Sequence, residues 1–152
     1  MAPDSRPLDN RPWALTIPSD LRLLPVARAF VEAVCQVGGL DKHTTDAVVL
    51  AMHEAANNII RHAHRDDPTA QVQLECHLFP DGIEVRLLDE GAPFDLDAVP
   101  ELDPSELRIG GRGVFLMRTL MDEVTCAPRG ERGNLLRLVK RSPGNVPRRD
   151  AV

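Results

Sequence analysis

The stretch HEAANNIIRHAH, from His53 to His64, gathers one carboxylate, two adjacent amides and three imidazoles. On a helix, Glu54, Asn58 and His62 would be four residues apart and would share one stripe of the surface. Glu54 could accept a proton from an attacking hydroxyl or water. The side-chain oxygen of Asn58 suits Mg²⁺, which takes the rest of its ligands from waters and a phosphate. This stripe therefore predicts a nucleotide nearby.

Two other interpretations of the stretch compete with this one. HEAAN resembles the zinc motif HExxH, but Asn57 replaces the second histidine, and an amide is a poor zinc ligand. His62 and His64 are two residues apart, so they diverge on a helix. The stretch could also be the ordinary solvent-exposed face of a surface helix. Only partners elsewhere in the chain decide between these interpretations.

The segment LLDEGAPFD places Asp89 and Gly91 just after a predicted strand. The Asp89 carboxylate could accept a hydrogen bond from an exocyclic amine such as that of adenine. Gly91 would leave room for the ring, because it has no side chain. A turn residue after a strand is the alternative interpretation of Asp89.

A cluster of glycines precedes the last predicted helix. In IGGRGVFLMRTLM, the glycines Gly110, Gly111 and Gly113 flank the cation Arg112. Free N–H groups at the start of a helix bind phosphate, and glycines let the backbone approach it. Glycine clusters also mark ordinary loops. The segment is not a Walker A loop, because no Gly-Lys-Ser/Thr follows, and it lacks the βαβ unit of a Rossmann fingerprint.

Hydrophobic spacing predicts the elements that position these residues. The predicted helices lie at 25–37, 42–65 and 113–124. The predicted strands lie at 13–17, 70–78, 83–89, 123–127 and 134–140. This order predicts an α+β fold, a two-layer sandwich with a mixed, mostly antiparallel sheet and helices on one face. We expect one domain at 13–141, between a flexible leader at 1–12 and a flexible tail at 142–152.

The composition excludes several classes of protein. The chain has 152 residues, enough for a single core. Its net charge of −5 argues against nucleic acid or an anionic membrane as the main partner, because both need a basic surface. Cys35, Cys76 and Cys126 are far apart, which predicts free buried thiols in a reducing compartment. The sequence has neither a visible signal peptide nor a membrane-spanning run, so we expect a cytoplasmic protein.

Taken together, four segments resemble the histidine-kinase-like ATPase (GHKL) superfamily and, within it, the anti-sigma-factor serine kinases of the RsbW type. In chain order they are HEAANNIIRHAH, DEGAPFD, GGRGVFLMRTLMDEV and RGNLLRLVKR. The resemblance extends over 13–141. Its specificity comes from the order and spacing of the four segments, since each is weak alone.

The resemblance implies a role for each matching residue. Glu54 matches the general base and Asn58 the Mg²⁺ ligand, whereas Asn57 falls at a variable position of the family. Asp89 and Gly91 match the box that reads adenine. Gly111 and Gly113 match the glycine box before the phosphate-binding helix, and Gly133 matches the final box. Arg112, between the first two glycines, adds a cation to the nucleotide-binding set.

Two further features follow from the resemblance. Asn134 stands where the family commonly has threonine after the glycine of its final box, so a hydrogen bond from this position to adenine is in doubt. The long loop at 92–110 would be the ATP lid, which folds over the phosphates and opens for exchange. His62 occupies a position that is often histidine in the family, and a structural imidazole is the interpretation we prefer.

The resemblance implies a serine/threonine protein kinase that uses ATP and Mg²⁺. Its substrate would be an anti-sigma-factor antagonist, and the kinase, expected as a homodimer, would also sequester a sigma factor. The alternative is a non-catalytic module that binds ATP and acts only by docking to a partner. Glu54 favours the kinase, because a binding module needs no base. We do not expect a sensor histidine kinase, since only about a dozen residues precede Trp13 and a phosphoacceptor hairpin is missing.

Overall fold

The computed structural model describes residues 11–65, 67–99 and 112–142. Its five strands form one sheet in the order β1-β2-β3-β5-β4, and every neighbouring pair is antiparallel. The strands are β1 (Trp13–Pro18), β2 (Gln71–Phe79), β3 (Gly82–Asp89), β4 (Glu123–Pro128) and β5 (Asn134–Arg141). The helices are α1 (Leu24–Val37), α2 (Lys42–Asn58) and α3 (Arg112–Leu120), with short helical turns η1 (Leu21–Leu23), η2 (Ile59–Ala63) and η3 (Leu96–Ala98).

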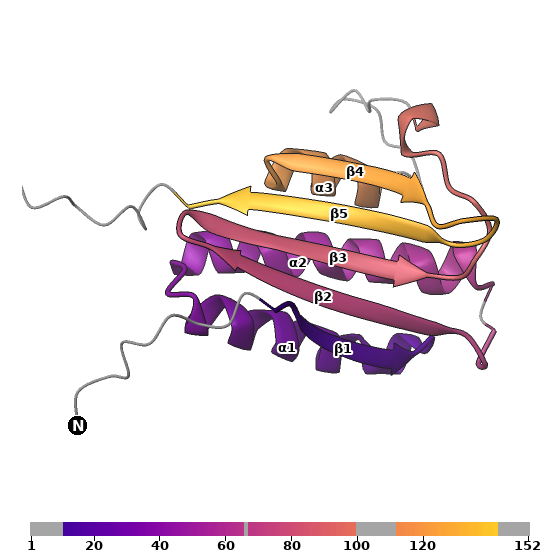
Figure 1. Ribbon diagram of the computed structural model, residues 1–152, viewed down its shortest axis with the longest axis horizontal. Helices are drawn as coiled ribbons and strands as arrows, with labels where there is room; N and C mark the ends of the chain where they lie inside the picture. The colour runs from indigo at the N-terminus through magenta and orange to yellow at the C-terminus, as the bar shows by residue number, and fades with distance from the viewer. Residues whose placement is uncertain (1–10, 66, 100–111, 143–152) are drawn as a thin grey trace, which may run out of the picture.

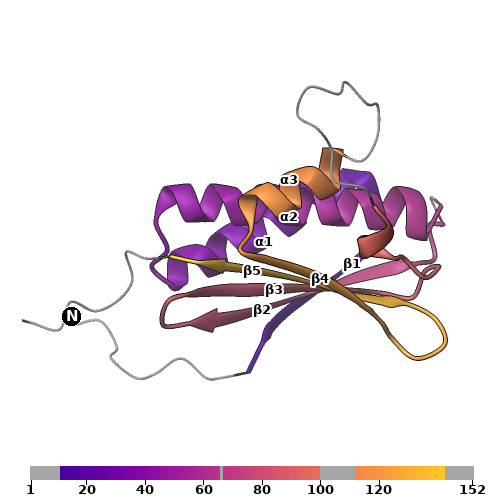
Figure 2. The same cartoon turned by 90° about the horizontal axis from the view of Figure 1, so that it is seen from above.

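All three α-helices cover the same face of the sheet (Figures 1 and 2). The expected two-layer α+β sandwich is therefore confirmed, with a sheet that is wholly antiparallel among the described strands instead of mixed. The expected leader and tail fall almost entirely at 1–10 and 143–152, outside the described residues. No helix in the described part of the chain is long and apolar enough to cross a bilayer.

Helix α2 carries the first predicted site residues, and its two ends differ in kind. At its start, Asp41 is the N-cap, and its Oδ1 accepts a hydrogen bond from the Thr44 N–H at 2.7 Å. The predicted helix is α-helical only as far as Asn58. It continues as the π-helical turn η2, closed by a hydrogen bond from the His64 N–H to the Ile59 carbonyl at 2.9 Å. Such turns insert one extra residue and often occur at functional sites.

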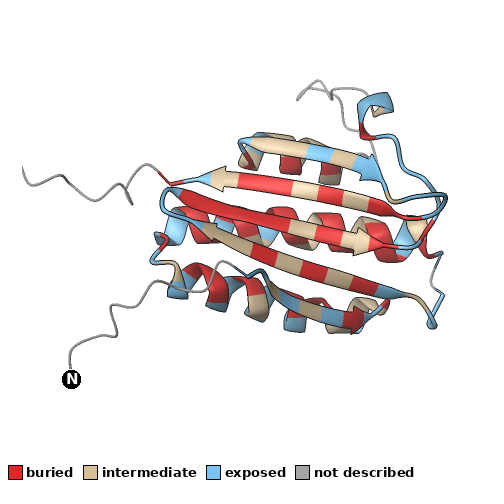
Figure 3. Cartoon of the chain, viewed as in Figure 1, coloured by how far each residue is buried: buried red, intermediate tan, exposed pale blue. Residues whose placement is uncertain are grey.

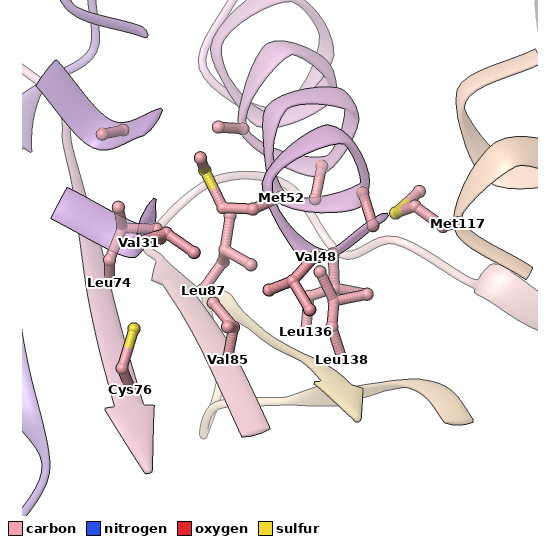
Figure 4. Close-up of a cluster of buried hydrophobic side chains, with 14 of the residues drawn as sticks. Val31, Val48, Met52, Leu74, Cys76, Val85, Leu87, Met117, Leu136 and Leu138 are labelled. Carbon is pink, nitrogen blue, oxygen red and sulfur yellow. The ribbon is translucent and has the colours of Figure 1, made fainter. Parts of the chain in front are cut away.

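The core lies between the sheet and the helices (Figures 3 and 4). Buried residues alternate with more exposed ones along β2, and six inward residues of β2 and β3 are at most 2% exposed. These inward residues are Val72, Leu74, Cys76, Ile83, Val85 and Leu87. They pack against fully buried helical residues, including Val31 of α1, Val48 and Met52 of α2 and Met117 of α3. Each such side chain contributes about 1.5–3 kcal/mol to folding, so this layer fixes where α2 and α3 lie on the sheet.

No helix of the described residues covers the opposite face of the sheet (Figure 2), and ion pairs lie on that face. Glu84 of β3 lies there and is only 3% exposed. Its carboxylate accepts a hydrogen bond from Arg137 Nε of β5 and forms an ion pair with Arg86 Nη2 at 3.1 Å. Two arginines therefore cover a carboxylate that a simple alternation of buried and exposed residues would leave in solvent.

The three cysteines are free thiols, as expected. Cys35 and Cys76 are buried, whereas Cys126 is half-buried. Burial raises the pKa of Cys35 to about 11 and that of Cys76 to about 12. Both thiols therefore stay protonated and unreactive at neutral pH, because the thiolate is the reactive form.

Candidate functional site

The stripe of α2 that carries Glu54 and Asn58 faces the beginning of α3. A Cβ atom built on Gly113 would lie 3.1 Å from Glu54 Oε2 and 3.1 Å from Asn58 Nδ2. The first turn of α3 is thus packed directly on these two side chains, at a distance that only a glycine permits without displacing them. Both side chains therefore face the glycine-flanked start of the last helix. A surface helix with a solvent-facing polar stripe would not produce this geometry.

A cavity of about 380 Å³ opens beside this contact, between α2, α3 and the end of the sheet. Most of its wall is apolar, and Asn58, His62, Asp89 and Asn134 are among its polar residues. The apolar lining includes Ala55, Ile59, Val114, Met117 and Leu136. An apolar cavity of this size with a few convergent polar groups is typical of a small-molecule site.

Asp89 is a buried polar group of this cavity, held by two hydrogen bonds. It is the last residue of β3 and is only 2% exposed. Its Oδ1 accepts hydrogen bonds from the Gly91 N–H at 2.8 Å and from Asn134 Nδ2 at 3.1 Å. Among the described residues, no donor bonds to Oδ2. The carboxylate therefore keeps one oxygen for a ligand, which is what recognition of an exocyclic amine requires.

Gly91 has a different neighbour from the one that the sequence suggested. It does not line the 380 Å³ cavity, and a Cβ added there would lie 2.7 Å from both the Cβ and the carbonyl oxygen of Ala63. The following N–H, that of Ala92, points at the same carbonyl at 3.5 Å. The glycine thus lets the loop after β3 close against the end of the π-helical turn, and it leaves no extra room for a ring. The hydrophobic pattern of the sequence does not predict this contact, because it depends on the π turn.

Gly133 shapes the site through the backbone. Its φ of +100° is in the region that favours glycine, and an added Cβ would lie 2.4 Å from the carbonyl oxygen of Asp89. Its N–H donates to the Gly91 carbonyl at 3.1 Å. Arg129, four residues earlier, donates from Nη1 to the Asp89 carbonyl at 3.0 Å. The turn between β4 and β5 is therefore fastened to the end of β3, which fixes Asp89 from behind.

Asn134 and Arg118 are site residues whose roles the sequence did not reveal. Asn134 lines the cavity and hydrogen-bonds to Asp89, as described above. Arg118 of α3 donates from Nη2 to the Leu96 carbonyl at 2.8 Å and from Nη1 to the Val99 carbonyl at 3.2 Å. The only sequence sign of Asn134 was its departure from the family threonine. An arginine in a helix carries no sign of the distant carbonyls that it binds.

The expected phosphate site and the expected lid are each described only in part. Arg112 is the first residue of α3 and is exposed, and it does not line the cavity. Gly111 lies outside the described residues, as does the larger part of the expected lid at 92–110. The described part of that loop, 92–99, contains the η3 turn and is bound to α3 through Arg118.

These residues fit a nucleotide with a divalent cation. Glu54 and Asn58 bring a carboxylate and an amide oxygen to the start of α3, and hard oxygen ligands of this kind suit such a cation. N–H groups at a helix start suit a phosphate. Asp89 offers its remaining oxygen inside the apolar cavity beside them. In the described part of the chain there is no group of three or more His, Cys, Asp or Glu residues that could hold a metal by protein ligands alone.

Known proteins are similar to this chain in sequence. Residues 17–140 match the family described as histidine kinase-like ATPase domain. The chain is 30% identical over 118 residues to the serine-protein kinase RsbW of Listeria innocua, with 72% of this chain and 75% of that protein covered. For RsbW of Bacillus subtilis the identity is also 30%, with 72% and 74% covered.

A solved structure has the same fold. The crystal structure of the RsbU and RsbW domains of a Mycobacterium tuberculosis protein matches with a TM-score of 0.62 and 16% identity. The match covers 86% of this chain and 31% of that longer one. The chain described here therefore belongs to the histidine kinase-like ATPase family, in the branch of the RsbW serine-protein kinases.

Proposed function

We propose that this protein is an ATP-dependent serine/threonine protein kinase and an anti-sigma regulatory factor. The observation that carries the proposal is the contact of Glu54 and Asn58 with Gly113, which brings a carboxylate and an amide to the start of a helix. The relatives are serine-protein kinases by name, which supports the reaction class. An ATPase domain of this family uses ATP with a divalent metal, and we assign Mg²⁺ because oxygen and water ligands suit it.

In this proposal each site residue has one task. Glu54 accepts the proton from the serine hydroxyl of the protein substrate, and Asn58 is a ligand of Mg²⁺. Asp89 accepts a hydrogen bond from the exocyclic amine of adenine. The backbone around Gly111, Arg112 and Gly113 binds the phosphates, and Gly91 and Gly133 let the loops close around Asp89. When bound, ATP supplies the phosphoryl group, so the protein contributes mainly positioning and charge neutralisation.

The partners are also part of the proposal. The family resemblance supports an anti-sigma-factor antagonist as substrate and a sigma factor as the second partner. Phosphorylation of the antagonist would decide which of the two the kinase holds. We further propose a homodimer in the cytoplasm, with the catalytic domain at 13–141. Neither direct nucleic-acid binding nor membrane binding is part of this function.

The competing function is a non-catalytic ATP-binding module. Both functions need Asp89, but only the kinase needs the carboxylate of Glu54. We expect Glu54→Gln to lower the rate of phosphotransfer to a purified antagonist by about 10²- to 10⁴-fold, which is the usual contribution of a general base. The same variant should bind ATP with an affinity within about threefold of the wild type, because Glu54 does not line the 380 Å³ cavity that would hold the adenine ring.

The experiment measures phosphate transfer from radiolabelled ATP and ATP affinity by calorimetry on the same preparations. Glu32→Gln is the matched control, since Glu32 is an exposed glutamate on α1. Asp89→Asn should weaken ATP binding and so test separately the assignment of Asp89 to adenine. Unchanged phosphotransfer in Glu54→Gln would contradict the assignment of Glu54 as the general base. A wild type that binds ATP but phosphorylates no antagonist offered to it would favour the binding module.

A further inference from the structure

Asn134 uses its whole side-chain amide to join three parts of the chain. It is the first residue of β5, directly opposite Asp89 in the sheet, and only 4% exposed. Its Nδ2 donates to Asp89 Oδ1 at 3.1 Å and to the Ala92 carbonyl at 2.9 Å. Its Oδ1 accepts a hydrogen bond from the Phe94 N–H at 2.9 Å. Both amide hydrogens and the carbonyl oxygen are therefore occupied.

This set of partners fits an asparagine and no residue of similar size. Threonine, which the family commonly has here, offers one hydroxyl donor and cannot serve two acceptors at once. Aspartate has no N–H and would place a second carboxylate beside Asp89. The departure from the family pattern thus coincides with a network that only the amide can complete.

The network links two functional parts of the cavity. With two donors on Oδ1, Asp89 has one preferred orientation, and rotation of its carboxylate would break both hydrogen bonds. The same amide holds the segment Ala92–Phe94, whose residues form part of the cavity wall. A shift of the wall and a rotation of the carboxylate are therefore coupled through one side chain.

We propose that Asn134 is the positioning residue that makes this cavity selective for a base with an exocyclic amine. It does so by holding the free oxygen of Asp89 and the wall segment Ala92–Phe94 in one arrangement. This inference rests on the proposed function, because it takes the cavity to be the site of the adenine ring.

The test compares the affinity for ATP with that for purine riboside triphosphate, which lacks the exocyclic amine, by calorimetry in the presence of Mg²⁺. The wild type should prefer ATP by about tenfold, as expected for one hydrogen bond to a charged group. In Asn134→Thr this preference should fall below about threefold, since Asp89 is no longer held. Asn57→Thr is the matched control, because within the described part of the chain the Asn57 side chain accepts a hydrogen bond from Arg61 Nε, one turn further along, at 3.0 Å and has no other partner.

A second pair of variants tests the link from the wall side. Phe94→Pro removes the N–H that donates a hydrogen bond to Asn134 Oδ1, whereas Phe94→Ala removes the same aromatic ring and keeps the N–H. Phe94→Pro should lose the preference for ATP, and Phe94→Ala should keep it. This pair leaves Asn134 in place, so it decides the question if Asn134→Thr does not fold.

The outcomes separate this inference from the proposed function. Retention of the tenfold preference in a folded Asn134→Thr, or in Phe94→Pro, would overturn the positioning role while the kinase proposal stood. A wild type that binds both nucleotides equally would also overturn the selectivity. A wild type that binds neither would contradict the inference and the proposed function together. A loss of affinity for both nucleotides with an unchanged ratio would make Asn134 merely structural and would overturn the proposal.

Discussion

Gly113→Ala is the substitution that most directly tests the contact between α2 and α3. The added methyl group would lie 3.1 Å from both Glu54 Oε2 and Asn58 Nδ2, so each side chain would have to move by a few tenths of an ångström. Both atoms are at the ends of flexible side chains, and moving them off their preferred rotamers costs about 0.5–1.5 kcal/mol. Against this, alanine in place of glycine within a helix stabilises the folded chain by about 0.5–1 kcal/mol.

The two contributions nearly cancel, so the free energy of unfolding should change by less than about 1 kcal/mol and the Tm by less than about 5 °C. Phosphotransfer should fall by about tenfold or more, because a displacement of reacting groups by a fraction of an ångström is costly to the rate. This separation of stability from activity follows from the position of Gly113 against the proposed base and the proposed metal ligand.

The measurements are thermal unfolding and the single-turnover rate of phosphotransfer at saturating ATP. Thr119→Ala is the control on the same helix, because Thr119 is exposed and its hydroxyl donates to the Phe115 carbonyl one turn earlier. A Gly113→Ala protein with wild-type turnover would refute the claim that Glu54 and Asn58 act together at this contact. A loss of several kcal/mol of stability would refute the claim that the side chains of Glu54 and Asn58 can move aside at low cost.

Two further predictions concern stability. Gly133→Ala should lower the free energy of unfolding by more than about 2 kcal/mol in a chemical melt, because its Cβ would lie 2.4 Å from the Asp89 carbonyl oxygen and φ is +100°. Gly130→Ala is the control, since φ is +60° but no atom of the described residues lies within 4 Å of the added Cβ. It should lower the free energy of unfolding by only about 1 kcal/mol. The raised pKa values of Cys35 and Cys76, about 11 and about 12, mean that the folded chain keeps protons which the unfolded chain releases above about pH 8.5. Their contribution to stability should therefore be lost as the pH rises from about 8.5 towards 12, and urea melts of Cys76→Ala over this range should show a shallower decline than those of the wild type.

The sequence was sufficient to predict the order and type of the elements. The alternation in β2 and β3 and the helical spacing in α1 and α2 arise from local chemistry, because each element must turn one apolar face to the core. The same spacing predicted that Glu54 and Asn58 share a stripe, and the glycines before α3 indicated what they would face. A base, a metal ligand and a helix start can be predicted in this way, since each depends on residues within one or two turns of the chain.

What only the tertiary structure decided is which distant segments meet. A two-residue period does not specify the partner of a strand, so the pairing of β3 with β5 could not be predicted, and that pairing brings Asn134 beside Asp89. The neighbour of Gly91 depends on the π turn at the end of α2, which the helical period does not encode. The hydrogen bonds of Asn134 span 40 to 45 residues, and a polar side chain chooses such partners only after the hydrophobic layer has set the backbone.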